Sequence, residues 1–139
     1  MVPPRTMHSA VARIFAPLLV AALTGCGDPG ALADDALPTA SDRGTFALDI
    51  VHDDGMFRRG SNSFVVRATD ASGSPAFVVG VTARMPGHDH GFDPPRIDCA
   101  DGACRVSDLL LTMPGRWDIT LQLSRPGERD QALLSPVLR

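Results

Sequence analysis

Methionine and histidine gather in one short stretch of the chain, residues 85–91, which reads Met-Pro-Gly-His-Asp-His-Gly. A second Met-Pro-Gly turn occupies residues 113–115 and is followed by Arg-Trp. Two imidazoles at positions i and i+2 of a turn, beside thioethers, form a borderline-to-soft ligand set without hard oxygen ligands. Such a set suits copper, particularly Cu(I), better than calcium or magnesium. The candidate metal ligands are Met85, His88, His90 and Met113.

The same residues also have a purely structural interpretation. Met-Pro-Gly is a good turn former, His88 and His90 can be ordinary surface residues, and either methionine can simply pack against Trp117. A further pair, His52 and Met56, flanks an Asp-Asp-Gly turn and is a candidate for the same end of the fold. Spacing alone does not decide between a metal site and well-packed turns.

The elements that must position these residues are short strands. Apolar and polar residues alternate with period two, and the segments are rich in Val, Ile, Phe, Thr and Leu between turns of Gly, Pro, Asn and Asp. Seven strands at this spacing predict an all-β fold, an immunoglobulin-like β-sandwich. In the last part of the chain Trp117 and Ile119 alternate with polar neighbours, which predicts that both are buried. The predicted strands are 45–51, 62–69, 76–84, 95–99, 103–112, 116–124 and 131–138.

Two cysteines flank a predicted hairpin turn. An Asp-Gly turn at 101–102 places Cys99 opposite Cys104 at a non-hydrogen-bonded position, where a disulfide can close. The alternative is that the two thiols bind metal or transfer electrons, although four intervening residues is not the spacing of the common redox motif. We predict a structural disulfide, the expected state in an oxidising compartment.

The N-terminal region has the order of an export signal. Arg5 and Arg13 precede an apolar run at 14–23, which is too short to span a bilayer as a mature helix. Leu-Thr-Gly-Cys at 23–26 resembles the lipobox of bacterial lipoproteins, which implies cleavage before Cys26 and lipid on that cysteine. We therefore expect a signal peptide at 1–25, the lipidated cysteine and a flexible tether at 26–44, and a folded domain at 45–139. The residue after Cys26 is glycine rather than aspartate, which favours the outer membrane.

Charge and motif content argue against two classes of function. Two of the 13 basic residues leave with the signal while all 16 acidic residues stay, so the mature chain has a net charge of about −5. An acidic chain without clustered basic residues is a poor match to nucleic acid. Because the chain has no nucleophile elbow, phosphate loop or zinc-protease helix motif, we expect no enzyme.

The order of several short motifs resembles the YtkA-like domain, which is related to the FixH group. The resemblance lies in residues 60–66, 70–75, 81–91 and 113–119 and covers the chain from about Thr45 onward. It implies an immunoglobulin-like sandwich outside the cytoplasm and an association with copper handling or cytochrome oxidase assembly, with Met85, His88, His90 and Met113 at the metal-facing positions. This chain differs from the FixH group because it has a lipobox in place of a transmembrane helix.

The leading hypothesis is a lipid-anchored envelope protein that faces the periplasm and binds copper as its cofactor or cargo. Its expected partners are the membrane, through the lipid on Cys26, and an envelope protein that donates or accepts copper. The alternative is a metal-free immunoglobulin-like module that docks a protein partner at the cell envelope.

Overall fold

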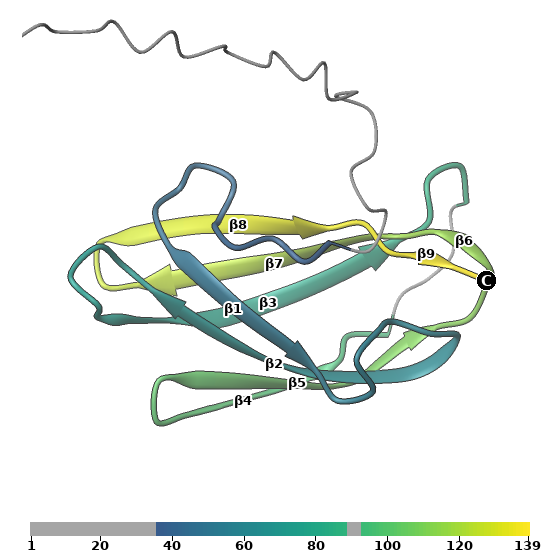
Figure 1. Cartoon of the computed structure of the whole chain (residues 1–139), viewed down its shortest axis with the longest axis horizontal. Helices are drawn as coiled ribbons and strands as arrows, with labels where there is room; N and C mark the ends of the chain where they lie inside the picture. Colours follow the sequence, from purple (N-terminus) through teal and green to yellow (C-terminus); the bar gives the residue numbers. More distant parts are fainter. Residues whose placement is uncertain (1–35, 89–92) are drawn as a thin grey trace, which may run out of the picture.

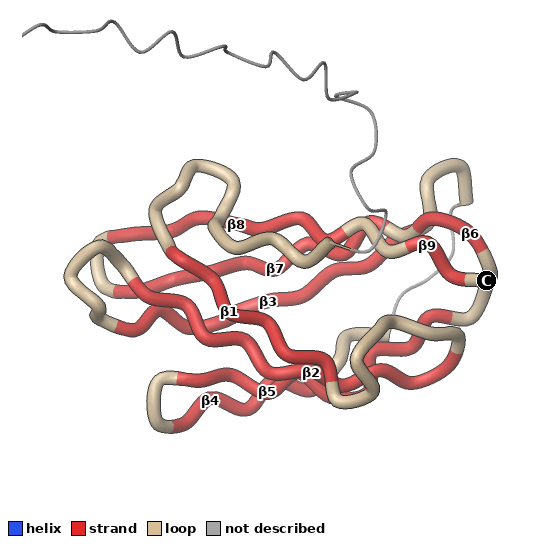
Figure 2. Tube along the Cα trace, in the orientation of Figure 1, coloured by secondary structure: helices blue, strands red, loops and turns tan. Residues whose placement is uncertain are grey.

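The computed structural model describes residues 36–88 and 93–139, and the described chain is all β (Figures 1 and 2). The expected signal peptide, Cys26 and most of the expected tether lie outside these residues. The described residues form the strands β1 (Ala47–His52), β2 (Gly60–Thr69), β3 (Pro75–Arg84), β4 (Arg96–Ala100), β5 (Ala103–Leu111), β6 (Gly115–Arg116), β7 (Asp118–Arg125), β8 (Glu128–Leu134) and β9 (Val137–Leu138).

The strands form the two layers of a β-sandwich (Figure 1). One layer has the strand order β4-β5-β2-β1 and the other has the order β3-β7-β8, with all pairs antiparallel. The layers are joined by the β2–β3 hairpin, whose ladder contains only two residue pairs, Ala68 with Ala76 and Thr69 with Pro75. Beyond these pairs β2 and β3 separate, which opens the space that the core fills. The short β6–β9 ladder closes one end.

Alternation along the strands builds the core, as the period-two pattern predicts. The inward-facing residues of β5, β7 and β8 are almost fully buried, while their neighbours in the sequence face outward. Trp117 and Ile119 are both buried, which confirms the prediction made for them. The largest fully buried apolar side chains are Phe46, Phe64, Leu109, Leu111, Ile119, Leu121, Leu123 and Leu134.

Two of the predicted strands are divided in the structure. The expected strand 116–124 is split at Trp117, because the chain changes partners there: Gly115 and Arg116 pair with β9, whereas β7 pairs with β3 and β8. The expected strand 131–138 is split into β8 and β9 around Ser135 and Pro136, since proline has no amide to continue a ladder.

The folded domain begins before residue 45, so the expected boundary of the tether is wrong at its C-terminal end. Leu37 packs against the core, and the Leu48 amide donates to the Thr39 carbonyl at 2.8 Å. The Asp42 amide donates to the Gln131 carbonyl on β8 at 2.7 Å. Residues 39–46 therefore bridge the edge strands β1 and β8, one from each layer (Figure 1).

A buried carboxylate on β8 holds this N-terminal segment. Asp130 accepts hydrogen bonds from Ser41 Oγ at 2.6 Å and from the Arg43 amide at 3.1 Å, and Arg43 Nε lies 3.2 Å from its other oxygen. Burial opposes ionisation and raises the pKa of Asp130. The hydrogen bonds from Ser41, the Gln131 amide, Arg43 and Thr45 outweigh it and hold this pKa well below its ordinary value. Asp130 is thus an ionised anchor that fastens residues 41–45 to β8.

Candidate metal site at one end of the sandwich

The two Met-Pro-Gly turns lie next to each other at one end of the sandwich. Arg84, the last residue of β3, pairs with Asp118, the first of β7, so Met85 continues one strand beside the residue that precedes the other. The turns also touch, since a Cβ placed on Gly115 would lie 3.3 Å from Cε of Met85. Gly115 has a φ of 116°, a backbone conformation that residues other than glycine rarely adopt. A glycine at this position therefore lets the Met85 methyl rest on the second turn.

The two methionines are buried to different degrees. Met85 is 9% exposed and belongs to the core, whereas Met113 is half-buried and packs against the core from its edge. Trp117 is close to both in the chain arrangement. Its indole donates to the Met113 carbonyl at 3.0 Å, and it lies next to Asp118, which pairs with the neighbour of Met85, Arg84. Packing against Trp117, the structural interpretation of these methionines, is consistent with this arrangement. Both methionines lie at the same end of the sandwich.

His88 is exposed and closes the first turn. Its amide donates to the Met85 carbonyl at 3.0 Å, with Gly87 at a positive φ of 83° between them. This bond places the backbone of His88 one turn after Met85. His90, the fourth candidate ligand, lies outside the described residues, as does Asp89.

The second candidate pair, His52 and Met56, does not form a ligand pair. His52 is buried, its Nδ1 accepts the Asp54 amide at 3.1 Å, and its Nε2 lies 3.3 Å from Asn62 Oδ1. Since Nδ1 is an acceptor, the proton is on Nε2, which donates to Asn62. Both ring nitrogens are therefore used inside the protein, while Met56 is 67% exposed in the loop.

His52 and Asn62 instead shape the loop between β1 and β2. Asn62 Oδ1 accepts the Arg58 amide at 2.9 Å, and its Nδ2 donates to the Arg58 carbonyl at 2.8 Å. The His52 ring packs edge-on against Phe57, with ring centroids 4.8 Å apart. This loop leads into Gly60, which pairs with Leu111 at the end of β5. The loop therefore lies at the same end as the Met-Pro-Gly turns, a placement that the sequence left open, but its histidine is structural.

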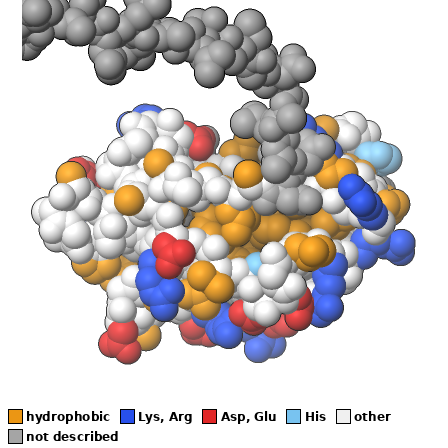
Figure 3. All heavy atoms as spheres, in the orientation of Figure 1, with side chains coloured by type: hydrophobic (Ala, Val, Ile, Leu, Met, Phe, Trp, Pro, Cys, Tyr) orange, Lys and Arg blue, Asp and Glu red, His pale blue; other side chains and the backbone are white. Residues whose placement is uncertain are grey.

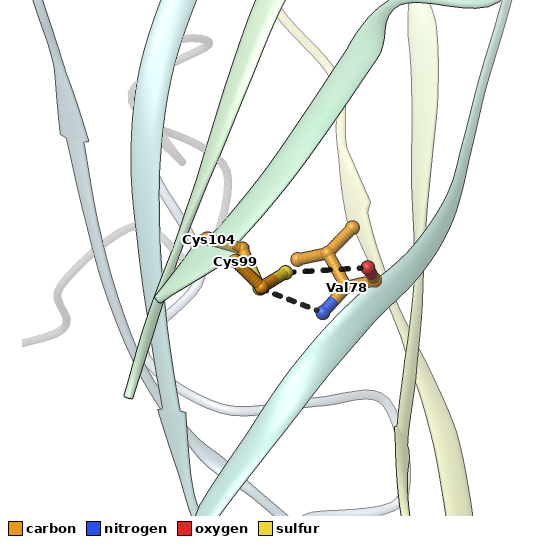
Figure 4. The surroundings of a disulfide bond; sticks show 3 residues. All are labelled: Val78, Cys99 and Cys104. Carbon is orange, nitrogen blue, oxygen red and sulfur yellow. Dashed lines mark hydrogen bonds between the residues drawn. A yellow bond between two sulfur atoms is a disulfide. The ribbon is translucent and has the colours of Figure 1, made fainter. Parts of the chain in front are cut away.

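Cys99 and Cys104 form the predicted disulfide, with an S–S distance of 2.05 Å (Figure 4). The register is the predicted one: Ala100 pairs with Ala103 and Cys99 with Cys104. Asp101 and Gly102 have φ values of 50° and 74°, as a two-residue type I′ turn requires. Cys104 is fully buried, whereas Cys99 on the edge strand β4 is exposed.

Sequence reasoning missed two features of the folded chain. One is the Asp130 anchor, which an acidic residue at an inward position of the β8 alternation could have indicated. The other is a hollow on the outer face of the β3-β7-β8 layer, lined by Phe77, Val79, Ser124 and Arg129 and overhung by Arg43. Its residues come from three separated segments, so no single motif marks it.

Among residues 36–88 and 93–139 there is no cluster of three or more His, Cys, Asp or Glu side chains that could hold a metal ion. A site at the Met-Pro-Gly end therefore depends on thioethers and on the histidines of residues 88–90. The same described ranges contain no helix with the length and apolar character needed to cross a membrane. The chain matches no protein-family model, and neither a curated protein nor a solved structure matches it.

Proposed function

We propose that this chain is a lipid-anchored envelope protein that binds Cu(I) at the end of the sandwich formed by its two Met-Pro-Gly turns. The observation that carries the proposal is the contact between these turns, in which the Met85 methyl lies against Gly115, two residues after Met113. The donor set is Met85, His88, His90 and Met113, two thioethers and two imidazoles, and this set fits a soft monovalent cation.

Burial assigns the donors different tasks. The Met85 thioether is in the core and lies in apolar surroundings, which favour a singly charged ion with soft ligands over a hydrated divalent one. His88 is exposed on the turn, where an imidazole can take the ion from solution or from a donor protein. Copper is thus cargo that enters through the exposed imidazole side and is retained by the thioethers, which suits a protein that passes copper to an envelope partner.

Anaerobic titration with Cu(I) against a competing chelator tests the proposal. The soluble protein for this titration starts at Ala36 rather than at Thr45, because Leu37 packs on the core and Asp130 binds Ser41 and Arg43. We expect one ion per chain. Loss of this ion in the His88→Ala/His90→Ala variant, without unfolding, would support the copper site.

Methionine variants separate ligation from packing. Met113→Leu keeps the apolar volume but removes the thioether, so we expect unchanged stability and at least tenfold weaker Cu(I) binding. Met56→Leu is the matched control, since Met56 is exposed and lies in a loop at the same end. Equal Cu(I) affinity in the two variants would contradict the assignment of Met113.

Lipid attachment is tested separately from copper. The Cys26→Ser variant of the full chain should move from the membrane fraction to the soluble fraction, because its acyl chains supply the membrane affinity. Fractionation of the two membranes would then show whether the native protein is in the outer one, which the glycine after Cys26 favours.

The second candidate function is a metal-free module that docks a protein partner. It is favoured by the outer face of the β3-β7-β8 layer, where Val79, 61% exposed, borders the hollow at Phe77. Leu133 on β8 is 46% exposed. If the protein does not compete with the chelator for Cu(I), this face is the first candidate for the binding site of a protein partner. Val79→Asp should then abolish cross-linking to the partner, whereas Val51→Asp, on the other layer, should not.

A further inference from the structure

The disulfide of the β4–β5 hairpin has two unlike sulfur atoms. Cys99 is exposed on the short edge strand β4, whereas Cys104 on β5 is 1% exposed. In thiol–disulfide exchange an incoming thiolate attacks one sulfur and expels the other, so access selects the sulfur that is attacked. Of the two residues, Cys99 is the one that a thiolate from solution can approach.

The expelled sulfur would have a hydrogen-bond donor in place. The amide of Val78 on β3 donates to Cys104 Sγ at 3.2 Å (Figure 4). The Val78 carbonyl oxygen lies 3.8 Å from Cys99 Sγ, in a part-buried contact. A hydrogen bond favours the charged form of the group that accepts it, so the Val78 amide stabilises negative charge on Cys104. The carbonyl offers no such help to Cys99.

The topology explains why this amide is turned toward the disulfide. The ladder between β2 and β3 stops at Ala76, while β3 continues to pair with β7 on its other edge. The β4–β5 hairpin lies against the edge of β3 that β2 has left, and its sulfur atoms take the Val78 peptide group as their neighbour (Figure 4). The donor is therefore held by the β-sheet and does not depend on a flexible side chain.

We infer that the Cys99–Cys104 disulfide is a site of thiol–disulfide exchange with a dithiol protein, with attack at Cys99 and departure of Cys104. The partner's thiolate bonds to Cys99 Sγ while the S–S bond breaks and its electron pair stays on Cys104 Sγ, beside the Val78 amide. The partner's second thiolate then attacks its own sulfur in the mixed disulfide and releases Cys99. The chain gains two electrons and, on protonation, two thiols, and the partner gains a disulfide.

This inference is independent of the proposed copper site, since the disulfide is in another part of the sandwich and exchange is measured without metal. The backbone holds Cys99 opposite Cys104 through the Asp-Gly turn, so the reduced pair remains placed to close again.

The first test maps the attacked sulfur in the full chain carrying Cys26→Ser, which leaves Cys99 and Cys104 as its two cysteines. This folded variant is mixed with reduced glutathione at about pH 8, where part of the glutathione is thiolate. The exchange is then stopped with acid, and the remaining thiols are blocked with an alkylating reagent. Trypsin then releases residues 97–105, and fragmentation locates each group. We expect glutathione on Cys99 and the alkyl group on Cys104 with at least tenfold preference. Equal labelling, a preference for Cys104, or no exchange without denaturant would overturn the inference.

The second test compares matched single variants in the same Cys26→Ser background. Cys104→Ser leaves the exposed thiol and Cys99→Ser leaves the buried one. We expect an aromatic disulfide reagent to modify Cys99 at least tenfold faster than Cys104 while both proteins remain folded by circular dichroism. Similar rates would refute the asymmetry. The mapping in the disulfide-bonded protein decides the question if either variant fails to fold.

Discussion

Replacement of the buried carboxylate of β8 provides a quantitative test of how the N-terminal segment is held. Asp130→Ala removes the acceptor of Ser41 Oγ and of the Arg43 and Gln131 amides. Ser41 is only 4% exposed, so its hydroxyl loses an acceptor that water cannot readily replace. Residues 41–45 should then detach from β8 and leave the edge between β1 and β8 uncovered.

The expected loss of stability follows from these contacts. An unsatisfied buried hydroxyl costs about 1–3 kcal/mol, and each lost bond from a part-buried amide to a charged acceptor about 1 kcal/mol. The guanidinium of Arg43 is 70% exposed, so its ion pair with Asp130 contributes little. The sum is about 3–5 kcal/mol. For a domain of about 100 residues this lowers the melting temperature by about 12–20 °C.

Urea unfolding followed by the fluorescence of Trp117, the single tryptophan, measures this change from the opposite end of the fold. Asp49→Ala is the control, since its ion pair with Arg67 at 3.6 Å lies on the surface and both side chains are more than half exposed. We expect the control to lose less than about 1 kcal/mol. If Asp130→Ala loses no more than Asp49→Ala, the Asp130 anchor does not hold the segment and our account of this edge is wrong.

Three further predictions follow from the same structure. Because the pKa of Asp130 is lower in the folded chain than its ordinary value of 3.8, its contribution to stability is present above that pH and is lost as the pH falls below it; acid titration of unfolding should be steeper for the native protein than for Asp130→Ala, and parallel curves would contradict this. Gly115→Ala combines a strained positive φ with a contact on the Met85 methyl, so it should lower stability by about 1–2 kcal/mol and weaken Cu(I) binding several-fold. Gly127→Ala, at a φ of 82° with no neighbour within 4 Å, should show the effect of the strain alone. Equal Cu(I) affinities of the two variants would show that the contact at Gly115 does not contribute to copper binding. Removal of the disulfide in Cys99→Ala/Cys104→Val should lower stability by about 2 kcal/mol, as expected for a short closed loop, without changing the fold seen by circular dichroism; a loss of the β-sheet signal would show that the hairpin depends on the bond.

Much of the fold could be predicted from local patterns. Alternation with period two identified each main strand, because most residues that face the core in a half-buried strand are apolar. The Asp-Gly turn determined the register of β4 with β5 and therefore the Cys99–Cys104 pair, since a two-residue hairpin allows one pairing. Burial of Trp117 and Ile119 followed from the same alternation.

The arrangement at the candidate site was only partly accessible. Met85 and Met113 could be placed at strand ends, but their proximity depends on the pairing of β3 with β7, which are far apart in the sequence. His52 has the residue type and position of a ligand, and only its contacts with Asp54 and Asn62 assign it to the loop. A metal-binding histidine and a structural histidine look the same in the sequence. They differ in burial and in whether both ring nitrogens are hydrogen-bonded inside the protein, and both of these depend on the tertiary structure.

The sequence by itself determined the all-β class, the main strands and the disulfide pair, because these depend on side-chain alternation and on turns of a few residues. Only the tertiary structure decided that the domain starts before Thr45, since Asp130 meets Ser41 across 89 positions of the chain. It also decided that the two Met-Pro-Gly turns touch and that Val78 donates to Cys104. Each of these contacts joins segments that local preferences do not connect, and they form only when two layers close around one core.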